Sequence, residues 1–314
     1  MAQGRKVGRV GIISFPGSSS LIHHIAEDKG FNESFGVEVV VTPTPNSVYQ
    51  ITNFVSGTFE IASTAIDNIV AYQEGQGAVA LDREPDMFVF LGGAKIDLAL
   101  TVAPGIDGYG GLKGKTIAVD ALSTGFAFVL RDMLERGGLG PDDYTLVSVG
   151  GTDKRWDALK AGEHVATLLN DPFTGFALDA GFKVLESSLD TLPHYQAGIF
   201  AARRSWAADN RDLLITYIRA HLAALDWLLD PANEAEATAI LRKHVPHLSE
   251  KGAAMAVSRL IAPRSGFPPK GAIDREGVKT VLDLRSRYGE PKTRLDDPDK
   301  YIDLSYYEAA LKAR

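Results

Sequence analysis

The stretch that decides the fold is Leu-Lys-Gly-Lys-Thr-Ile-Ala-Val-Asp-Ala-Leu-Ser-Thr-Gly, residues 112–125. Its apolar segment 117–119 has the composition of a buried strand, and a polar turn ending in 123–125 precedes a helical pattern that runs to Gly137. Such a turn places free backbone N–H groups, two hydroxyls and a flexible glycine at the carboxyl end of a strand, where α/β proteins hold small polar ligands. The stretch therefore predicts an α/β fold with a binding site beside this turn.

Apolar segments of strand length alternate with helical patterns on both sides of this stretch. The predicted strands of the first block are 10–14, 37–41, 60–63, 87–91 and 98–102, and those of the second block, from about 115 to 186, are 116–119, 145–149, 166–169 and 183–185. Helices are predicted between the first strands, over 21–29, 48–56 and 65–73. Alternation at this spacing is typical of βαβ units with largely parallel sheets.

The pattern changes after residue 198. One more strand is predicted over 199–202, and the rest of the chain is nearly all helical. The strongest helix pattern covers 211–229, where leucine and isoleucine recur at spacings of three and four. Further helices are predicted over 234–244, 249–260, 275–288 and 306–312.

The composition excludes several classes of function. The chain has 314 residues, 45% of them hydrophobic, which is enough for two domains or one large one. A net charge of −7 gives no basic footprint for nucleic acid. With no cysteine, disulfides, thiolate metal sites and thiol nucleophiles are excluded. No apolar run is long enough for a membrane span.

No motif indicates a metal or a cofactor. Lys113-Gly114-Lys115-Thr116 suggests a phosphate-binding loop, but Tyr109 stands where its first glycine belongs, and the stretch precedes a strand instead of following one. The seven histidines are scattered without metal-ligand spacing, and no Gly-x-Ser-x-Gly motif of a hydrolase occurs. We expect neither a metal site nor a cofactor.

Polar segments follow four of the predicted strands, at 14–20, 63–68, 123–125 and 170–173. Each of them also suits a helix N-cap, and Thr64 with Asp67 resembles a capping box. All four lie at the carboxyl ends of strands, two in each block, and such loops face a crevice in open sheets. Together they predict a ligand site that draws on both blocks.

An ordered series of segments resembles the substrate-binding proteins of ABC importers in the nitrate, sulfonate and taurine group, including the thiamine-pyrimidine-precursor branch. The segments that carry the resemblance are 112–124, 138–143, 157–163, 170–173 and 201–205. The chain departs from the pattern at His164, where these proteins have a valine-aspartate step. The resemblance spans roughly residues 8–260.

The resemblance implies a two-lobed periplasmic-binding-protein-like fold of type II, in which each lobe is a mixed, mostly parallel sheet flanked by helices. Lobe one would comprise 1–98 plus 200–314 with the helical C-terminal region, and lobe two would comprise 99–199. Hinge crossovers would lie near 98–104 and 195–201. The ligand would sit between the lobes, and ligand contacts to both would close them.

The implied function is that of a solute-binding protein, which captures a small polar, heteroaromatic or sulfonate-like solute and delivers it to a membrane ABC permease. We expect a monomer in the periplasm or another extracytoplasmic space. The start of the chain shows no leader, so either a leader was removed or the protein is cytoplasmic. The candidate ligand contacts are Phe15, Ser18, Ser19, Ser63, Thr64, Asp67, Ser123, Thr124, Gly125, Phe126, Asn170, Asp171 and Tyr195.

These candidates have different expected roles. The hydroxyls and nearby backbone N–H groups would hold polar atoms of the ligand, and the helix that begins near Gly125 favours negative charge at its N-terminus. Phe15, Phe126 and Tyr195 could stack on a flat solute. Asp171 would accept a hydrogen bond from a donor or cation on the ligand.

The signals for ligand charge conflict, because the helix N-terminus favours an anion and the aspartate opposes one. A zwitterionic or neutral heteroaromatic ligand reconciles them. Basic partners are few, since only Lys95 and Arg155 are plausible, and we expect both to be exposed to solvent.

An enzyme on the same fold is the alternative, with a decarboxylase-like or pyrimidine-precursor-related activity in the cytoplasm. His24 or Asp67 could then serve as a base, although no spacing selects them. The absence of cysteine argues against the desulfinase type, which uses a thiol nucleophile, and against the cysteine-rich pyrimidine synthase.

Overall fold

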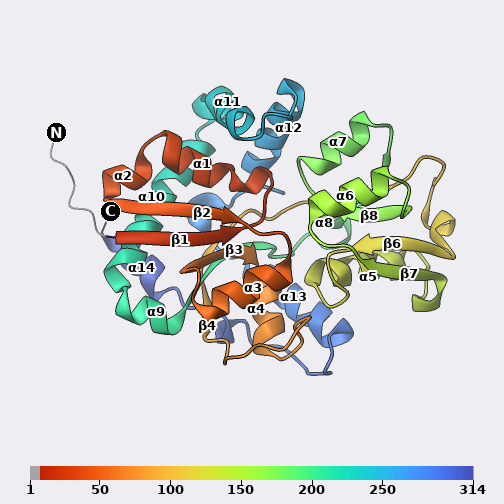
Figure 1. Ribbon diagram of the computed structural model, residues 1–314, viewed down its shortest axis with the longest axis horizontal. Helices are drawn as coiled ribbons and strands as arrows, with labels where there is room; N and C mark the ends of the chain where they lie inside the picture. Colours follow the sequence, from red (N-terminus) through yellow and green to blue (C-terminus); the bar gives the residue numbers. More distant parts are fainter. Residues whose placement is uncertain (1–7, 314) are drawn as a thin grey trace.

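The computed structural model describes residues 8–313 and contains two five-stranded sheets. The strands of the first sheet are β1 (Gly8–Ser14), β2 (Val37–Pro43), β3 (Ile61–Ala65), β4 (Met87–Gly92) and β10 (Gly198–Arg203). Those of the second sheet are β5 (Ala99–Val102), β6 (Lys115–Val119), β7 (Tyr144–Ser148), β8 (Ala166–Leu169) and β9 (Lys183–Ser187). Figure 1 shows the two sheets side by side, each with its own helices.

Fourteen α-helices accompany these sheets in the described part of the chain. The first unit, built on the first sheet, contains α1 (Leu21–Asp28), α2 (Phe31–Phe35), α3 (Ser47–Ser56), α4 (Ile66–Gln73), α9 (Arg204–Asp209), α10 (Arg211–Leu229), α11 (Glu234–His244), α12 (Glu250–Ile261), α13 (Arg275–Tyr288) and α14 (Ser305–Lys312). The second unit, built on the second sheet, contains α5 (Gly125–Arg136), α6 (Thr152–Lys160), α7 (Phe173–Asp179) and α8 (Ser188–Thr191). None of the helices within residues 8–313 is long and apolar enough to cross a membrane.

Both sheets are mixed, which confirms the predicted fold class. The first has the order β2-β1-β3-β10-β4, in which β10 runs antiparallel to both of its neighbours. The second has the order β7-β6-β8-β5-β9, in which β5 is the antiparallel strand. In each sheet the other pairings are parallel. All ten predicted strands are present, but β5, which the sequence pattern assigns to the first block, belongs to the second sheet because it pairs with β8 and β9.

The chain passes from one sheet to the other only twice within the described residues. The first connection, 93–98, leads from β4 to β5, and the second, 188–197, leads from β9 back to β10. Both lie beside the crossovers that the sequence predicts. Whether they act as hinges, and whether the lobes divide at 98/99 and 199/200, stays a prediction.

Helix α10 shows how the sequence pattern becomes packing. The helix predicted over 211–229 is present with these bounds. Its side chains at Leu214, Ile218, Leu222 and Leu225 are fully buried. They belong to the apolar core that α10 forms with the first sheet and with helices α1 and α12. Four short helices, α2, α7, α8 and α9, are not predicted, because stretches of four to seven residues are too short to show a helical period.

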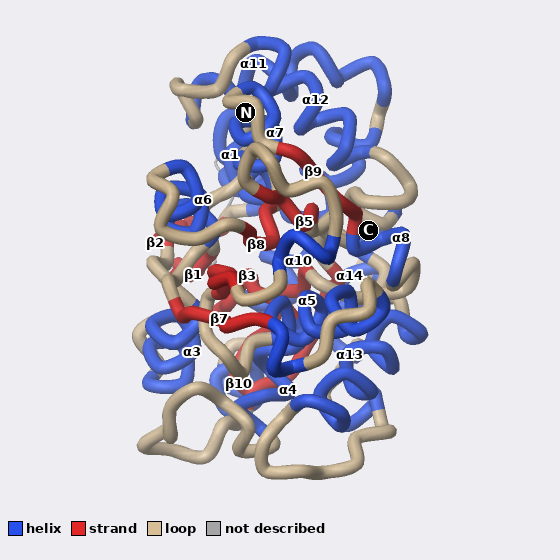
Figure 2. Tube along the Cα trace, turned by 90° about the vertical axis from the view of Figure 1, so that its right-hand side faces the viewer, coloured by secondary structure: helices blue, strands red, loops and turns tan. Residues whose placement is uncertain are grey.

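A second apolar core runs through both units. It contains Ile13 and Phe54 of the first unit, Ile117 and Phe128 of the second, and Val281 of α13. Helix α13 packs against both α4 and α5, so it joins the two units at one side. Seen from the second unit, the strands of that unit lie between α11 and α12 above and α4 and α13 below (Figure 2).

Candidate functional site

A cavity lies between the two units, where the carboxyl ends of β1, β3, β6 and β8 approach one another. The first unit and the connections line it with Ser14, Phe15, Pro16, Ser19, Ser47, Ser63, Thr64, Ala65, Asp67, Asn68, Gly93, Ala94, Ile96, Gly198, Ile199, Phe200 and Phe267. The second unit lines it with Asp120, Thr124, Gly125, Phe126, Gly151, Thr152, Asp153, Arg155 and Asn170. The cavity volume is about 90 Å³. A single water needs about 10–15 Å³, so the cavity has room for a small organic solute.

Nine of the thirteen predicted contact residues line this cavity. They are Phe15, Ser19, Ser63, Thr64, Asp67, Thr124, Gly125, Phe126 and Asn170. The other four, Ser18, Ser123, Asp171 and Tyr195, are not among the lining residues. The loops at the strand ends therefore meet at one shared cavity, and a ligand contact at any of these residues stays a prediction.

Asp67 occupies the helix N-terminus at which the sequence analysis places negative charge of the ligand. The Gly125 backbone N–H, the first of α5, donates to Asp67 Oδ2 at 2.5 Å. A Cβ at position 125 would lie 2.2 Å from Asp67 Cγ, so only glycine permits this approach. The predicted capping box of Thr64 and Asp67 is wrong, because α4 has no side-chain cap and Thr64 Oγ1 instead accepts from Asn68 Nδ2 at 2.9 Å.

Arg285 neutralises Asp67. Its Nε donates to Asp67 Oδ1 at 2.6 Å and its Nη2 to Oδ2 at 2.8 Å, and both side chains are almost completely buried. The same Nη2 donates to the carbonyl of Ser123 at 2.7 Å, so Ser123 takes part through its backbone. Tyr195 is buried nearby, and burial raises the pKa of its hydroxyl well above its usual value.

Asp171 and Ser18 form a contact between the units beside the cavity. Both carboxylate oxygens of Asp171 accept from Arg259 Nη1 of α12 at 2.7 Å. Burial raises the pKa of Asp171, while the ion pair with Arg259 acts in the opposite direction. The Ser18 backbone N–H donates to the Asp171 carbonyl at 3.3 Å.

The expectation that Arg155 is exposed is wrong. It lines the cavity, yet only 3% of its surface is exposed. Its Nε donates to the Gly150 carbonyl at 3.1 Å, Nη1 to Thr167 Oγ1 at 3.2 Å and also to the Leu168 carbonyl, and Nη2 to Thr152 Oγ1 at 2.9 Å. Burial lowers the pKa of Arg155 to about 10, against the opposing effect of Asp120 and Asp153.

Asp120 and Ser47 are lining residues that the sequence reasoning missed. Ser47 Oγ, from the first unit, donates to Asp120 Oδ2 of the second unit at 2.5 Å. Asp120 Oδ1 is buried and accepts no hydrogen bond within the described residues. The signal was present, since Asp120 directly follows the strand that ends at Val119, the same kind of position as the four polar segments.

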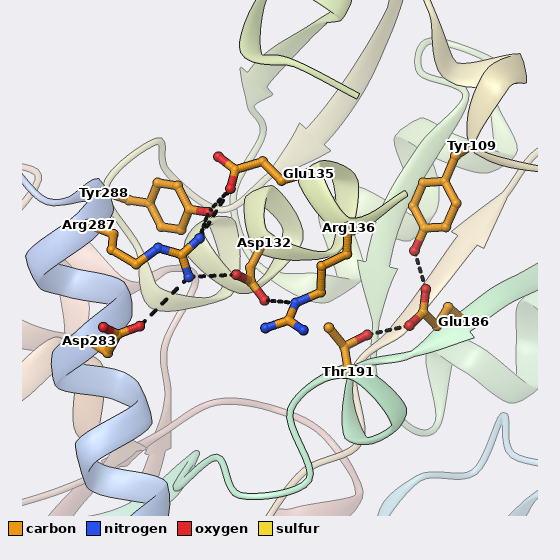
Figure 3. A network of polar contacts seen from close by, with 9 residues as sticks. All are labelled: Tyr109, Asp132, Glu135, Arg136, Glu186, Thr191, Asp283, Arg287 and Tyr288. Atoms are coloured by element: carbon orange, nitrogen blue, oxygen red, sulfur yellow. Dashed lines mark hydrogen bonds and ion pairs between the residues drawn. The ribbon is translucent and has the colours of Figure 1, made fainter. Parts of the chain in front are cut away.

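Helices α5 and α13 hold the two units together on another side of the cavity through polar side chains (Figure 3). Asp132 of α5 is almost completely buried and accepts from Arg287 Nη1 at 2.7 Å and from Arg136 Nε at 2.8 Å. Glu135 accepts from the Tyr288 hydroxyl at 2.7 Å and from Arg287 Nη2 at 3.1 Å. Within residues 8–313, no group of three or more His, Asp or Glu side chains could hold a metal ion.

Two α/β units with mixed sheets and a cavity between them define a periplasmic-binding-protein-like fold. Residues 5–242 match the model of the NMT1-like family, which is more than half of the chain. The protein therefore belongs to the NMT1-like family. No curated protein matches its sequence.

Solved structures with similar folds include periplasmic binding proteins and a component of an ABC-type import system. The periplasmic nitrate-binding protein NrtA from Synechocystis PCC 6803 is 15% identical, with a TM-score of 0.78 over 100% of this chain and 90% of that one. A ligand-binding component of an ABC-type import system from Staphylococcus aureus, with zinc bound, is 12% identical, with a TM-score of 0.78 over 96% and 99%. The periplasmic aliphatic sulphonate-binding protein SsuA from Escherichia coli is 19% identical, with a TM-score of 0.67 over 95% and 91%. At these identities the likeness concerns the fold.

Proposed function

We propose that the protein is a solute-binding protein, which captures a small organic solute between its two units and delivers it to an ABC permease outside the cytoplasm. The observation that carries this proposal is the cavity, because loops at the carboxyl ends of strands from both units line it. The similar folds of a ligand-binding component of an ABC-type import system and of two periplasmic binding proteins support the same function.

The binding mechanism follows from the arrangement of the lining residues. Phe15 of the first unit and Phe126 of the second would contact apolar surface of the solute, while Ser63, Thr64 and Thr124 would hold its polar atoms. A solute that contacts both units binds the closed arrangement better than an open one, so binding shifts the population toward closure. The connections 93–98 and 188–197 would bend during this motion.

The bases named for an enzyme do not suit that role. Asp67 is held by Arg285 and by the Gly125 N–H, and its carboxylate accepts three hydrogen bonds. His24 does not line the cavity, and its ring stacks on that of His244 with the centroids 3.9 Å apart. The described residues thus favour capture of a solute over chemistry on it.

The test is a thermal-shift screen of the full chain against nitrate, sulfonates, pyrimidines and aromatic acids or amines, followed by titration calorimetry of every hit. A solute at about 100 times its dissociation constant should stabilise the protein by about 2.7 kcal/mol. Phe15→Ala and Phe126→Ala should each weaken the hit by tenfold or more, because each removes one wall of the cavity. Tyr49→Ala is the matched control, since Tyr49 is 44% exposed and does not line the cavity.

Small-angle X-ray scattering should show a smaller radius of gyration with the hit bound. If both phenylalanine variants retain the affinity of the unmodified protein, the solute binds elsewhere and the proposal fails.

A further inference from the structure

The most favourable place for an anion in this cavity is already filled. A helix N-terminus attracts negative charge, and α5 presents its first N–H groups to the cavity at Gly125. Asp67 places its own carboxylate there at 2.5 Å. An anionic solute at this position would therefore meet a carboxylate that already accepts from the first N–H of the helix.

The remaining charges at the cavity are mostly negative. Asp120 and Asp153 add two carboxylates to that of Asp67, and Arg155 supplies the only guanidinium among the described lining residues. The net formal charge of the lining is therefore −2, or −1 when the buried Arg285 that pairs with Asp67 is included. A cation is favoured over an anion in such surroundings, because charges interact more strongly at the lower effective dielectric constant of a protein than in bulk water.

Arg155 offers little to an anion in spite of its charge. A guanidinium has five N–H donors, and four hydrogen bonds from Arg155 already go to carbonyls and hydroxyls of the second unit. Lys95, whose neighbours Ala94 and Ile96 line the cavity, directs its ammonium to the Pro263 carbonyl at 3.1 Å. A bidentate clamp on a nitrate or sulfonate group is therefore absent from the described lining.

The apolar part of the lining also suits a flat cation. Four phenylalanines contribute to it, Phe15, Phe200 and Phe267 from the first unit and Phe126 from the second. Aromatic faces carry partial negative charge, so they attract organic cations and stack on planar groups. Asp120 Oδ1 adds a buried acceptor that receives no hydrogen bond from the described residues.

We propose that the solute is a flat organic molecule bearing an amidinium-type or protonated N-heteroaromatic group, and that Asp120 selects it against small anions. The inference rests on the proposed function, since it names the class of solute that the cavity takes. N–H donors of the solute would approach Asp120, and its planar part would lie among the phenylalanines.

Benzamidinium and benzoate provide the test, because they have nearly the same shape and opposite charge. Calorimetry on the full chain should show benzamidinium binding at least tenfold more tightly than benzoate. Asp120→Asn keeps the shape and the acceptor for Ser47, and it should reduce this preference at least fivefold. Asp142→Asn is the control, because Asp142 is exposed and lies outside the cavity. If Asp120→Asn does not fold, Asp153→Asn replaces it, since the Asp153 side chain is 38% exposed and also lines the cavity.

The outcomes separate this inference from the proposed function. Tighter or equal binding of benzoate, tighter binding of nitrate or ethanesulfonate, or no binding of either probe overturns the assignment of a cation. In each of these cases a different solute that depends on Phe15 and Phe126 leaves the capture function standing. A preference for benzamidinium that Asp120→Asn leaves unchanged overturns the role of Asp120.

Discussion

The Asp67 carboxylate joins three parts of the molecule. It lies on α4 of the first unit, accepts from the first N–H of α5 in the second unit, and pairs with Arg285 of α13. Asp67 and Arg285 have 2% and 0% of their side chains exposed. Removing one member of a buried ion pair leaves the other charge without a partner, which costs more than the pair contributes.

We therefore predict that Arg285→Met lowers the free energy of unfolding by about 3–5 kcal/mol. The double variant Asp67→Asn with Arg285→Met should recover part of this loss, because it leaves no unpaired buried charge. Urea unfolding followed by circular dichroism measures both. A loss below about 1 kcal/mol in the single variant would mean that water or another group reaches the Asp67 carboxylate.

At the scale of single residues, the sequence predicts which residues lie at the cavity better than it predicts their hydrogen-bond and ion-pair partners. Ser63 and Thr124 could be placed at the cavity because Ser63 lies near the carboxyl end of β3 and Thr124 follows β6, and strand ends meet at one edge of a sheet. The partner of Asp67 lies 218 residues away, and no local pattern connects the two. Arg155 looks like a surface residue of a polar helix, and only the fold shows that α6 turns it toward β8.

At the scale of elements, helices α1 and α10 enclose a pair of buried histidines. The ring centroids of His23 and His221 lie 6.3 Å apart, and both rings contact that of Phe200. Phe200 also lines the cavity. Burial is the main cause that lowers the pKa of each ring to about 3. The charge of a neighbouring histidine acts in the same direction, that of His24 on His23 and that of His23 on His221. Both rings are therefore neutral in the folded protein.

The two buried histidines make the folded protein less stable as the pH falls. The unfolded chain binds protons at both histidines below a pKa of about 6.5, whereas the folded chain does not do so until about 3. The contribution of these two histidines to the free energy of unfolding is therefore fully present above pH 6.5 and is lost as the pH falls toward 3. We predict a loss of about 2 kcal/mol per histidine between pH 7.5 and pH 5.

Urea midpoints across this pH range measure the effect. The double variant His23→Leu with His221→Leu should show a shallower decline than the unmodified protein. An equally steep decline in the double variant would assign the pH dependence to other groups.

The element scale is also where sequence prediction is strongest. Long amphipathic helices such as α10 and α13 match their predicted ranges, because a helical period repeats several times in each. The pairing of β10 between β3 and β4 could not be read from spacing, since it brings Gly198 opposite Ala65 although the whole second sheet lies between them in the sequence. The resemblance to a known family supplied the division into lobes.

At the scale of the whole molecule, the two units touch on more than one side of the cavity. Helix α13 joins them through Arg285 and Arg287, and α12 joins them through the pair of Arg259 with Asp171. The carboxylate of the second contact is the more exposed, since 18% of the Asp171 side chain is accessible against 2% each for Asp67 and Asp132. It is the weaker of the two and the easier to open.

We predict that Asp171→Asn shifts the solute-free protein toward an open arrangement. Loss of a partly exposed ion pair costs about 1 kcal/mol or less, so affinity for a solute held in the cavity should fall roughly two- to fivefold. Calorimetry measures the affinity, and small-angle scattering of the solute-free protein should show a larger radius of gyration.

Asp107→Asn is the control for this variant, because Asp107 pairs with Lys183 inside the second unit. If affinity and radius of gyration both stay at the values of the unmodified protein, the contact of α12 with Asp171 has no part in closure.

The strand order has a consequence for how the protein can be taken apart. Strands β5 and β9 are the first and last strands of the second sheet along the chain, and they pair with Ala99 opposite Ser187. In the first sheet, β4 and β10 pair with Gly92 opposite Ile199. Opposed residues of antiparallel strands are about 5 Å apart, so a short loop could bridge either pair. The segment 99–187 is thus an insert. With a short loop joining Gly92 to Ile199 in its place, the chain would give two polypeptides that each keep an unbroken sheet and their own part of the cavity lining.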